Sequence, residues 1–125
     1  MEQLIKVLLV EDDEFSAMVT TQVLKGCCEI DLVETGEDAI EYAGKKKFDV
    51  ILMDIGLPGM GGLKAAGIIR VMPGYENTPI VALTAFAMSG DKEEFLQGGC
   101  SHYLSKPFAV SDLLNLVKSL VSEAC

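Results

Sequence analysis

The 125-residue sequence contains no tryptophan, a single histidine and no long apolar run. Its first apolar stretch, residues 4–10, is interrupted by Lys6 and is far shorter than the roughly 20 residues that a membrane-spanning helix requires. The opening residues, 1–3, also lack the basic segment of a secretion signal. We therefore expect a cytoplasmic protein without a membrane segment.

Scarce positive charge and the spacing of the cysteines exclude two further classes of function. Ten basic residues stand against nineteen acidic ones, and the resulting net charge of −9 repels the phosphate backbone of nucleic acids, so direct DNA or RNA binding is not expected. The four cysteines, at positions 27, 28, 100 and 125, show neither C-x-x-C spacing nor histidine partners. We interpret them as reduced thiols, and not as a zinc site or a disulfide framework.

The length suits one compact domain, and we interpret residues 1–125 as a single unit. Apolar runs of strand length alternate five times with segments of helical periodicity. This alternation is typical of an α/β fold in which a parallel sheet lies between two layers of helices. The predicted strands are residues 4–10, 29–33, 48–53, 79–83 and 101–105.

The composition of each run predicts its place in the sheet. Residues 4–10, 48–53 and 79–83 are almost continuously apolar, as in strands that are buried on both faces. The other two runs are partly polar and are therefore predicted at the edges. With right-handed crossovers, the simplest strand order is 2-1-3-4-5, in a doubly wound three-layer (βα)5 sandwich.

Five helices are predicted. The first is expected to present an apolar face made of Phe15, Met18, Val19 and Val23. Gly26 is expected to end this helix in a left-handed conformation, and Thr35 with Asp38 forms a capping box at the start of the second. The remaining helices are predicted near residues 63–72, 90–98 and 110–121, the last with an apolar stripe that packs on the sheet.

Polar residues come directly after four of the predicted strands. These residues are Glu11-Asp12-Asp13, Asp54, Thr84 and Lys106. Because ligands of open parallel sheets bind beyond the carboxyl ends of the strands, we expect these side chains to meet there. Any one of them alone could be an ordinary solvated loop residue. Together they require a cation, because two carboxylates 4 Å apart repel by about 4 kcal/mol at an effective dielectric constant of 20.

Mg²⁺ is the predicted cation, because it binds through one or two carboxylates and leaves positions for waters and phosphoryl oxygens. Asp12 and Asp54 are its expected direct ligands. Lys106 and Thr84 can contact phosphoryl oxygens, and a carboxylate can act as the nucleophile by forming an aspartyl-phosphate. The set of residues therefore predicts phosphoryl transfer.

Over nearly its whole length, the sequence resembles the receiver domains of two-component response regulators, the CheY-like family. The resemblance rests on four segments in order: residues 9–13 (LVEDD), 53–60 (MDIGLPGM), 83–85 (LTA) and 105–108 (SKPF). The stretch of residues 83–100 looks closest to small stand-alone receivers and to the receivers of hybrid kinases.

The resemblance implies a role for each matching residue. The implied roles are phosphoacceptor for Asp54; metal ligands for Glu11, Asp12, Asp54 and the carbonyl of Gly56; phosphoryl contacts for Thr84, Ala85 and Lys106; switch residues for Thr84 and Tyr103; and a cis peptide bond before Pro107. Two positions depart from the family pattern. Glu11 replaces the commoner aspartate and can reach the metal through water, and Gly61-Gly62 stands where Asp-Gly is frequent.

The resemblance also implies a phosphoacceptor switch instead of a conventional enzyme. A histidine kinase or phosphotransfer protein would phosphorylate Asp54, and the chain would catalyse its own phosphorylation and dephosphorylation. The added group carries nearly two negative charges, which would draw Thr84 and Lys106 inward, with Tyr103 following. A downstream protein would then bind the face formed by the fourth helix, fifth strand and fifth helix.

Three alternative functions remain open at this stage. A haloacid-dehalogenase-like phosphatase also uses an aspartyl-phosphate and Mg²⁺, but needs a second aspartate where this sequence has Gly56. A flavodoxin-like carrier shares the strand order, but acidic residues 11–14 would repel a flavin phosphate. A degenerate receiver that serves only as a scaffold is disfavoured, because no phosphorylation residue is missing.

Overall fold

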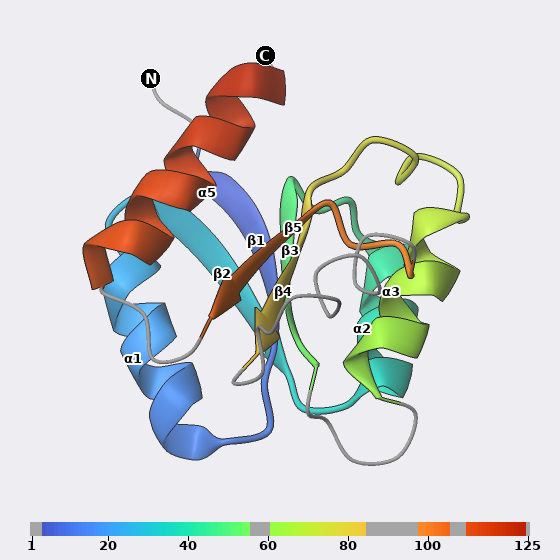
Figure 1. Ribbon diagram of the computed structural model, residues 1–125, viewed down its shortest axis with the longest axis horizontal. Coiled ribbons are helices and arrows are strands. Elements are labelled where there is room, and N and C mark those ends of the chain that lie inside the picture. Colours follow the sequence, from blue (N-terminus) through green and yellow to red (C-terminus); the bar gives the residue numbers. More distant parts are fainter. Residues whose placement is uncertain (1–3, 56–60, 85–97, 106–109, 125) are drawn as a thin grey trace.

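The computed structural model describes residues 4–55, 61–84, 98–105 and 110–124. These residues form five strands and four helices (Figure 1). In chain order the elements are β1 (Ile5–Val10), α1 (Glu14–Leu24), β2 (Cys28–Val33), α2 (Gly36–Lys45), β3 (Val50–Asp54), α3 (Gly62–Arg70), β4 (Ile80–Thr84), β5 (His102–Ser105) and α5 (Val110–Ala124). The helix predicted near residues 90–98 falls almost entirely outside the described residues.

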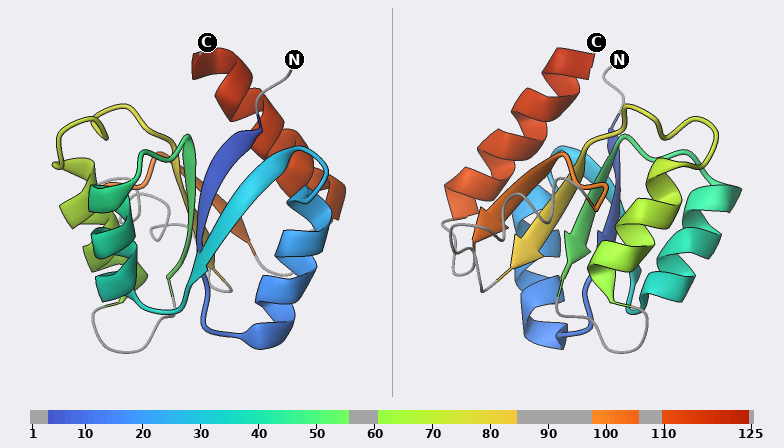
Figure 2. Two further views of the ribbon diagram at one scale, coloured as in Figure 1. Left: turned by 180° about the vertical axis from the view of Figure 1, so that it is seen from behind. Right: turned by 45° about the vertical axis from the view of Figure 1, so that its right-hand side comes forward.

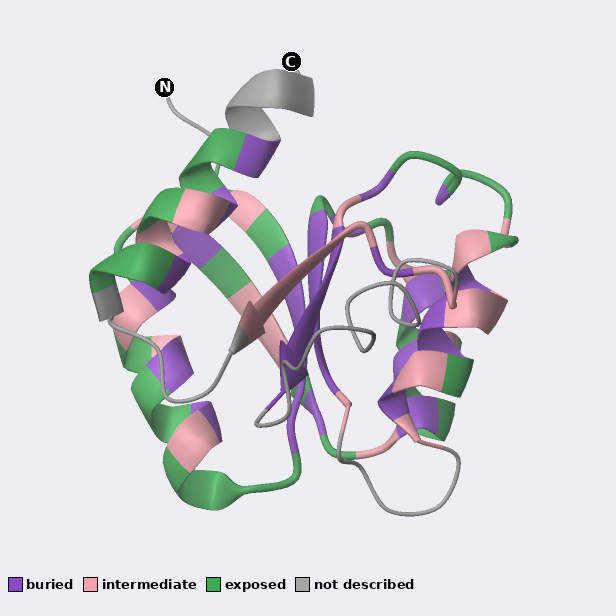
Figure 3. Cartoon of the chain, viewed as in Figure 1, coloured by how far each residue is buried: buried purple, intermediate pink, exposed green. Residues whose placement is uncertain are grey.

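The five strands pair in parallel in the order β2-β1-β3-β4-β5. The predicted α/β class and the order 2-1-3-4-5 are therefore confirmed. Every residue of β3 and β4 is buried, whereas the edge strand β2 is buried only at its two end residues, Cys28 and Val33, and is more exposed between them (Figure 3). Continuous apolar character in the sequence thus identified the strands that are covered on both faces.

Helices cover both faces of the sheet: α1 and α5 lie on one side, and α2 and α3 on the other (Figures 1 and 2). Successive strand residues point to opposite faces of the sheet and contribute to two apolar layers. Leu8, Ile51 and Met53 belong to the layer under α2 and α3, while Leu9 and Leu52 belong to the layer under α1 and α5. Each fully buried side chain of this kind contributes about 1.5–3 kcal/mol, so the two layers hold the sheet rigidly between them.

The apolar face predicted for α1 is wrong for three of its four residues, Phe15, Met18 and Val19, which are exposed. Phe15 and Met18 expose 69% and 55% of their surface, and the residues that α1 buries are Ala17, Thr20 and Leu24. Ala17 and Thr20 are small, so this face of the helix can lie close to its neighbours in a layer that α5 already fills with large side chains. Phe15, Met18 and Val19 therefore stand on the surface, whereas Val23 is half-buried and packs against the layer under α1 and α5.

The helix ends agree with the sequence in one case and differ in another. Thr35 is the N-cap of α2, and its hydroxyl oxygen accepts a hydrogen bond of 3.0 Å from the backbone N–H of Asp38, as predicted. Gly26 does not adopt the expected left-handed conformation, because the glycines with positive φ in the described chain are Gly61, Gly74 and Gly99. None of the helices in the described segments is both long and apolar enough to cross a bilayer.

Candidate functional site

Three of the predicted site residues lie where central strands end. Glu11 follows β1, Asp54 is the last residue of β3 and Thr84 is the last residue of β4. Because these strands are parallel neighbours, their ends share one edge of the sheet, at the bottom of Figure 1. All three residues are buried, with exposed fractions of 2%, 8% and 4%. Polar groups buried in this way need partners, since burial without them costs free energy.

Glu11, Asp12 and Asp54 converge, as the sequence predicted. One carboxylate oxygen from each lies within 4.8 Å of the other two. At this separation two carboxylates repel by about 3–4 kcal/mol if the effective dielectric constant is 20. Asp12 is exposed, so the cluster is open to solvent on that side. The donor set consists entirely of carboxylate oxygens and therefore fits a hard divalent cation such as Mg²⁺.

The acidic turn after β1 is held in place by the start of α1. The Asp13 carboxylate caps this helix by accepting a 2.8 Å hydrogen bond from the backbone N–H of Ser16. The backbone N–H of Asp13 in turn donates to the Glu11 carboxylate at 3.3 Å. The backbone N–H of Glu11 donates to the carbonyl of Val33 at 3.0 Å, which ties the turn to β2. The carboxylates therefore project from a fixed backbone.

Gly62 makes room for the end of β3, and the sequence did not reveal this role. A Cβ atom on Gly62 would lie 2.1 Å from the backbone oxygen of Asp54, so a side chain at this position would collide with the backbone that carries the predicted phosphoacceptor. Gly61, with a φ of 83°, directs the chain into α3 at the same point. Gly61-Gly62 was visible as a departure from the family pattern, but the contact that requires the second glycine is visible only in three dimensions.

Of the remaining predicted site residues, Tyr103 is the one that the structure describes. Tyr103 lies on β5, is half-buried and packs against the apolar layer under α2 and α3. Its register partner on β4 is Ala82, two residues before Thr84, so the two predicted switch residues occupy neighbouring strands. The other residues of the predicted set, which are Gly56, Ala85, Lys106 and Pro107, lie outside the described residues.

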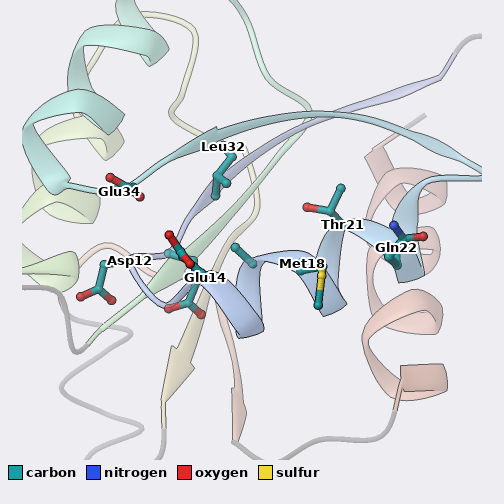
Figure 4. A pocket seen from close by; sticks show the side chains of 9 residues that line it. Asp12, Glu14, Met18, Thr21, Gln22, Leu32 and Glu34 are labelled. Carbon is teal, nitrogen blue, oxygen red and sulfur yellow. The ribbon is translucent and has the colours of Figure 1, made fainter.

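A groove runs from the carboxylate cluster along α1 to β2 (Figure 4). Its polar lining is largely acidic, with Glu11, Asp12, Glu14 and Glu34, and its apolar lining includes Met18 and Leu32. Leu32 exposes 46% of its surface, so apolar side chains stand on the surface beside the acids. The sequence analysis missed this surface. The helical spacing of residues 17, 20 and 24 was the available sign that α1 has a second face to bury.

Comparison with known proteins identifies close relatives over most of the chain. A family model for the response regulator receiver domain matches residues 7–118. Hybrid signal transduction histidine kinase G of Dictyostelium discoideum is 41% identical over 89% of this chain, which spans only 3% of that kinase. The polar-differentiation response regulator DivK of Brucella anthropi is 34% identical, with 94% of this chain and 97% of DivK covered.

A solved structure of a receiver domain matches the fold over nearly the whole chain. It is the crystal structure of the receiver domain of the sensor histidine kinase PA1611 from Pseudomonas aeruginosa, with a magnesium ion coordinated in its active site cleft. The TM-score is 0.88 and the sequence identity 35%, over 96% of this chain and 99% of that one.

Proposed function

The chain belongs to the response regulator receiver domain family of two-component systems, and from this premise we propose that Asp54 is the residue that accepts the phosphoryl group. Receiver domains obtain this group from histidine kinases or phosphotransfer proteins, and they act as phosphoacceptor switches. The observation that carries the assignment to Asp54 is the carboxylate cluster at the end of β3, with oxygen atoms of Glu11, Asp12 and Asp54 within 4.8 Å.

The proposed reaction is an in-line transfer from phosphohistidine. A carboxylate oxygen of Asp54 bonds to phosphorus while the phosphorus–nitrogen bond of the donor breaks, and the imidazole nitrogen keeps the electron pair. Thr84, at the neighbouring strand end, would donate a hydrogen bond to a phosphoryl oxygen. The family resemblance implies that Ala85 and Lys106 also contact phosphoryl oxygens. We also propose that water attacks the phosphorus of phosphorylated Asp54, so that the chain removes its own phosphoryl group.

Mg²⁺ is the proposed metal. Glu11, Asp12 and Asp54 would hold it, together with the Gly56 carbonyl that the family resemblance implies. When bound, the ion neutralises negative charge on the phosphoryl oxygens and on the clustered carboxylates. The burial of Glu11, at 2% exposed, supports a fixed acidic wall on one side of the site, while the exposed Asp12 leaves the other side open for a donor.

The output of the switch is proposed from the resemblance. The new dianionic group would attract the Thr84 hydroxyl and the Lys106 ammonium group, and Tyr103 would turn inward with Thr84. A downstream protein would distinguish the two states on the face of the fourth helix, β5 and α5. The setting that we propose for this signalling is the cytoplasm.

We propose that the phosphodonor docks along α1. Phe15 and Met18 are exposed apolar residues on this helix, and the groove beside Met18 leads to Asp12 and Glu11. A donor that covers this surface removes apolar area from water and at the same time brings its phosphohistidine to the carboxylate cluster.

The assignment of Asp54 is tested by incubating the chain with acetyl phosphate, with and without Mg²⁺, and measuring the intact mass. Wild type should gain one phosphoryl group in the presence of Mg²⁺, and Asp54→Asn should gain none. Asp49→Asn is the matched control, because Asp49 precedes the same strand at its opposite end and accepts a hydrogen bond from the backbone N–H of Lys6 at 2.9 Å. A phosphorylated Asp54→Asn variant would refute the assignment.

The docking surface is tested by comparing two donors. Phe15→Ala should slow transfer from a phosphorylated histidine kinase or phosphotransfer protein roughly tenfold, the effect of losing about 1.4 kcal/mol of contact energy. The rate with acetyl phosphate should not change, because this small donor needs no protein surface. Val71→Ala is the control, since Val71 is apolar and 81% exposed at the end of α3. Equal rates for both variants with the protein donor would exclude α1 as the docking surface.

A further inference from the structure

Two adjacent thiols lie side by side at the amino end of β2. The Sγ atoms of Cys27 and Cys28 are 3.4 Å apart. Cys28 is the first residue of β2 and is 5% exposed, whereas Cys27 is half-buried and reaches solvent. The strand has six residues, so the pair lies about 17 Å from the end of β2 that borders the carboxylate cluster.

Both side chains face the same apolar layer. Successive residues of a regular strand point to opposite faces of a sheet, but Cys27 and Cys28 both contact the layer under α1 and α5. The turn after α1 accounts for this orientation. The backbone N–H of Cys27 donates to the carbonyl of Leu24 at 3.1 Å, and its carbonyl accepts from the N–H of Ile5 at 3.1 Å. The backbone thus holds two neighbouring sulfur atoms on the same side, as a bond between them requires.

We propose that Cys27 and Cys28 form a reversible oxidation site, in which the two thiols become joined in a disulfide by exchange with a small disulfide such as oxidised glutathione. The Cys27 thiolate attacks one sulfur of the oxidant, whose disulfide bond breaks and releases one thiolate. Cys28 then loses its proton to solvent and attacks the Cys27 sulfur, which releases the second thiolate. Two electrons and two protons pass from the pair to the oxidant, which leaves as two thiols.

The surroundings set the order of these two attacks. Burial, together with the hydrogen bond to Cys27, raises the pKa of the Cys28 thiol to about 12, and Lys118 of α5 offsets part of this rise. As long as Cys27 is reduced, Cys28 therefore stays protonated, and its burial keeps it out of reach of an external oxidant. Cys27 reacts first because it reaches solvent. Ring closure by Cys28 is then favoured by its position, since the neighbouring sulfur has a very high effective concentration.

The geometry of adjacent residues also implies that the oxidised form is easily reduced. Consecutive Cα atoms are about 3.8 Å apart, which is less than the roughly 4.4 Å at which the usual range for disulfides begins. A disulfide between neighbours is therefore compressed, and compressed disulfides exchange readily with thiols. The pair is suited to a reversible response to the thiol–disulfide balance, and not to permanent stabilisation of the fold.

Cys100 provides an internal comparison. It is 3% exposed in the opposite apolar layer, and burial raises its pKa to about 11. An oxidant that reacts with any accessible thiol should therefore leave Cys100 reduced, while Cys27 reacts through its exposed side.

Peptide mass spectrometry tests the proposal. The protein is incubated with oxidised glutathione, its remaining thiols are alkylated, and the chain is cleaved with trypsin. Cleavage after Lys25 and Lys45 gives a peptide, residues 26–45, that contains Cys27 and Cys28 and no other cysteine. We expect this peptide to lack two hydrogen atoms and carry no alkyl group, and dithiothreitol should restore two thiols that can be alkylated. The peptide with Cys100 should be alkylated throughout.

Variants separate the proposed disulfide from other outcomes. Cys27→Ser should abolish the loss of two hydrogens, and this half-buried position tolerates a hydroxyl group. Cys100→Ser and Asp54→Asn should be oxidised at positions 27 and 28 as wild type is, because the site depends neither on Cys100 nor on phosphorylation. A lasting mixed disulfide with glutathione at Cys27 or Cys28, a disulfide that joins either of them to another chain, or full alkylation of peptide 26–45 would each overturn the proposal.

Discussion

The two ends of the central sheet differ in the polar groups that they bring together. At the carboxyl end, Glu11, Asp12 and Asp54 bring like charges within 4.8 Å of one another. At the amino end, the polar groups satisfy one another. The hydroxyl of Tyr75 accepts from the backbone N–H of Phe48 at 3.2 Å and can donate to the carbonyl of Lys46 at 2.8 Å or of Ala43 at 3.0 Å.

The ammonium group of Lys47 adds a positive charge to the hydrogen-bonded groups at the amino end. The ammonium group of Lys47 lies 4.1 Å from the centre of the Tyr75 ring and donates to the Thr78 hydroxyl at 2.8 Å and to the Gly74 carbonyl. Tyr75 is 2% exposed, and burial raises the pKa of its phenol, which therefore stays neutral. The clustered carboxylates thus lie at the end where chemistry is proposed, and the buried tyrosine with its hydrogen-bond partners lies at the end that holds α2 and the loop before β4. We interpret the amino end as the one that stabilises the fold and the carboxyl end as the one where the proposed chemistry takes place.

The largest effect is expected for Gly62→Ala, which should lower the free energy of unfolding although Gly62 lies at the carboxyl end of the sheet, beside the proposed site. The new Cβ would lie 2.1 Å from the backbone oxygen of Asp54, so β3 and α3 must move apart. We expect a loss of about 3 kcal/mol in the free energy of unfolding, measured by urea denaturation, with slower phosphorylation of the folded fraction.

Gly26→Ala is the matched control for this prediction. Gly26 has open space around its Cβ position and no positive φ. The substitution should leave stability unchanged or raise it by about 0.4–1 kcal/mol. Equal losses at both positions would show that the effect is one of glycine flexibility and not of the contact with Asp54.

Tyr75→Phe should have the next largest effect, and it removes hydrogen bonds at the amino end of the sheet. The variant keeps the ring but leaves the backbone N–H of Phe48 and a carbonyl at the end of α2 without their buried partner. We expect a loss of about 1–3 kcal/mol in the free energy of unfolding. Phosphorylation by acetyl phosphate should proceed at the wild-type rate, and a slower rate would show that the two ends are coupled.

Asp12→Asn should have the smallest effect on stability, and of opposite sign. Removing one of three clustered carboxylates relieves repulsion, so without Mg²⁺ the variant should be more stable than wild type by about 1 kcal/mol. Added Mg²⁺ should raise the melting temperature of wild type but not of the variant. If the variant is less stable than wild type without metal, Asp12 stabilises the fold. This result would contradict the interpretation that the carboxylate cluster takes part only in the proposed chemistry.

The mixed success of the predictions for the helices has a physical cause. In α5, the predicted apolar stripe is correct at the residues whose burial is described, since Leu113, Val117 and Leu120 are buried. The prediction succeeds because no other face of that helix is apolar enough to pack on the sheet instead. In α1, two faces were available. The larger apolar residues, such as Phe15, pointed to one face, and the small residues Ala17 and Thr20 are what the packed layer accommodates.

The sequence by itself determined which strands are central and which lie at the edges, and it determined the convergence of Glu11, Asp12 and Asp54. Both follow from local facts, because continuous apolar runs must be covered on two faces, and parallel strands bring the residues after them to one edge. Only the tertiary structure decided which face of α1 is buried, that Gly62 must lack a side chain, and that Cys27 and Cys28 share one side of the sheet. These features depend on distances between segments that are far apart in the chain, or on the exact path of a turn, and no local pattern of residues encodes them.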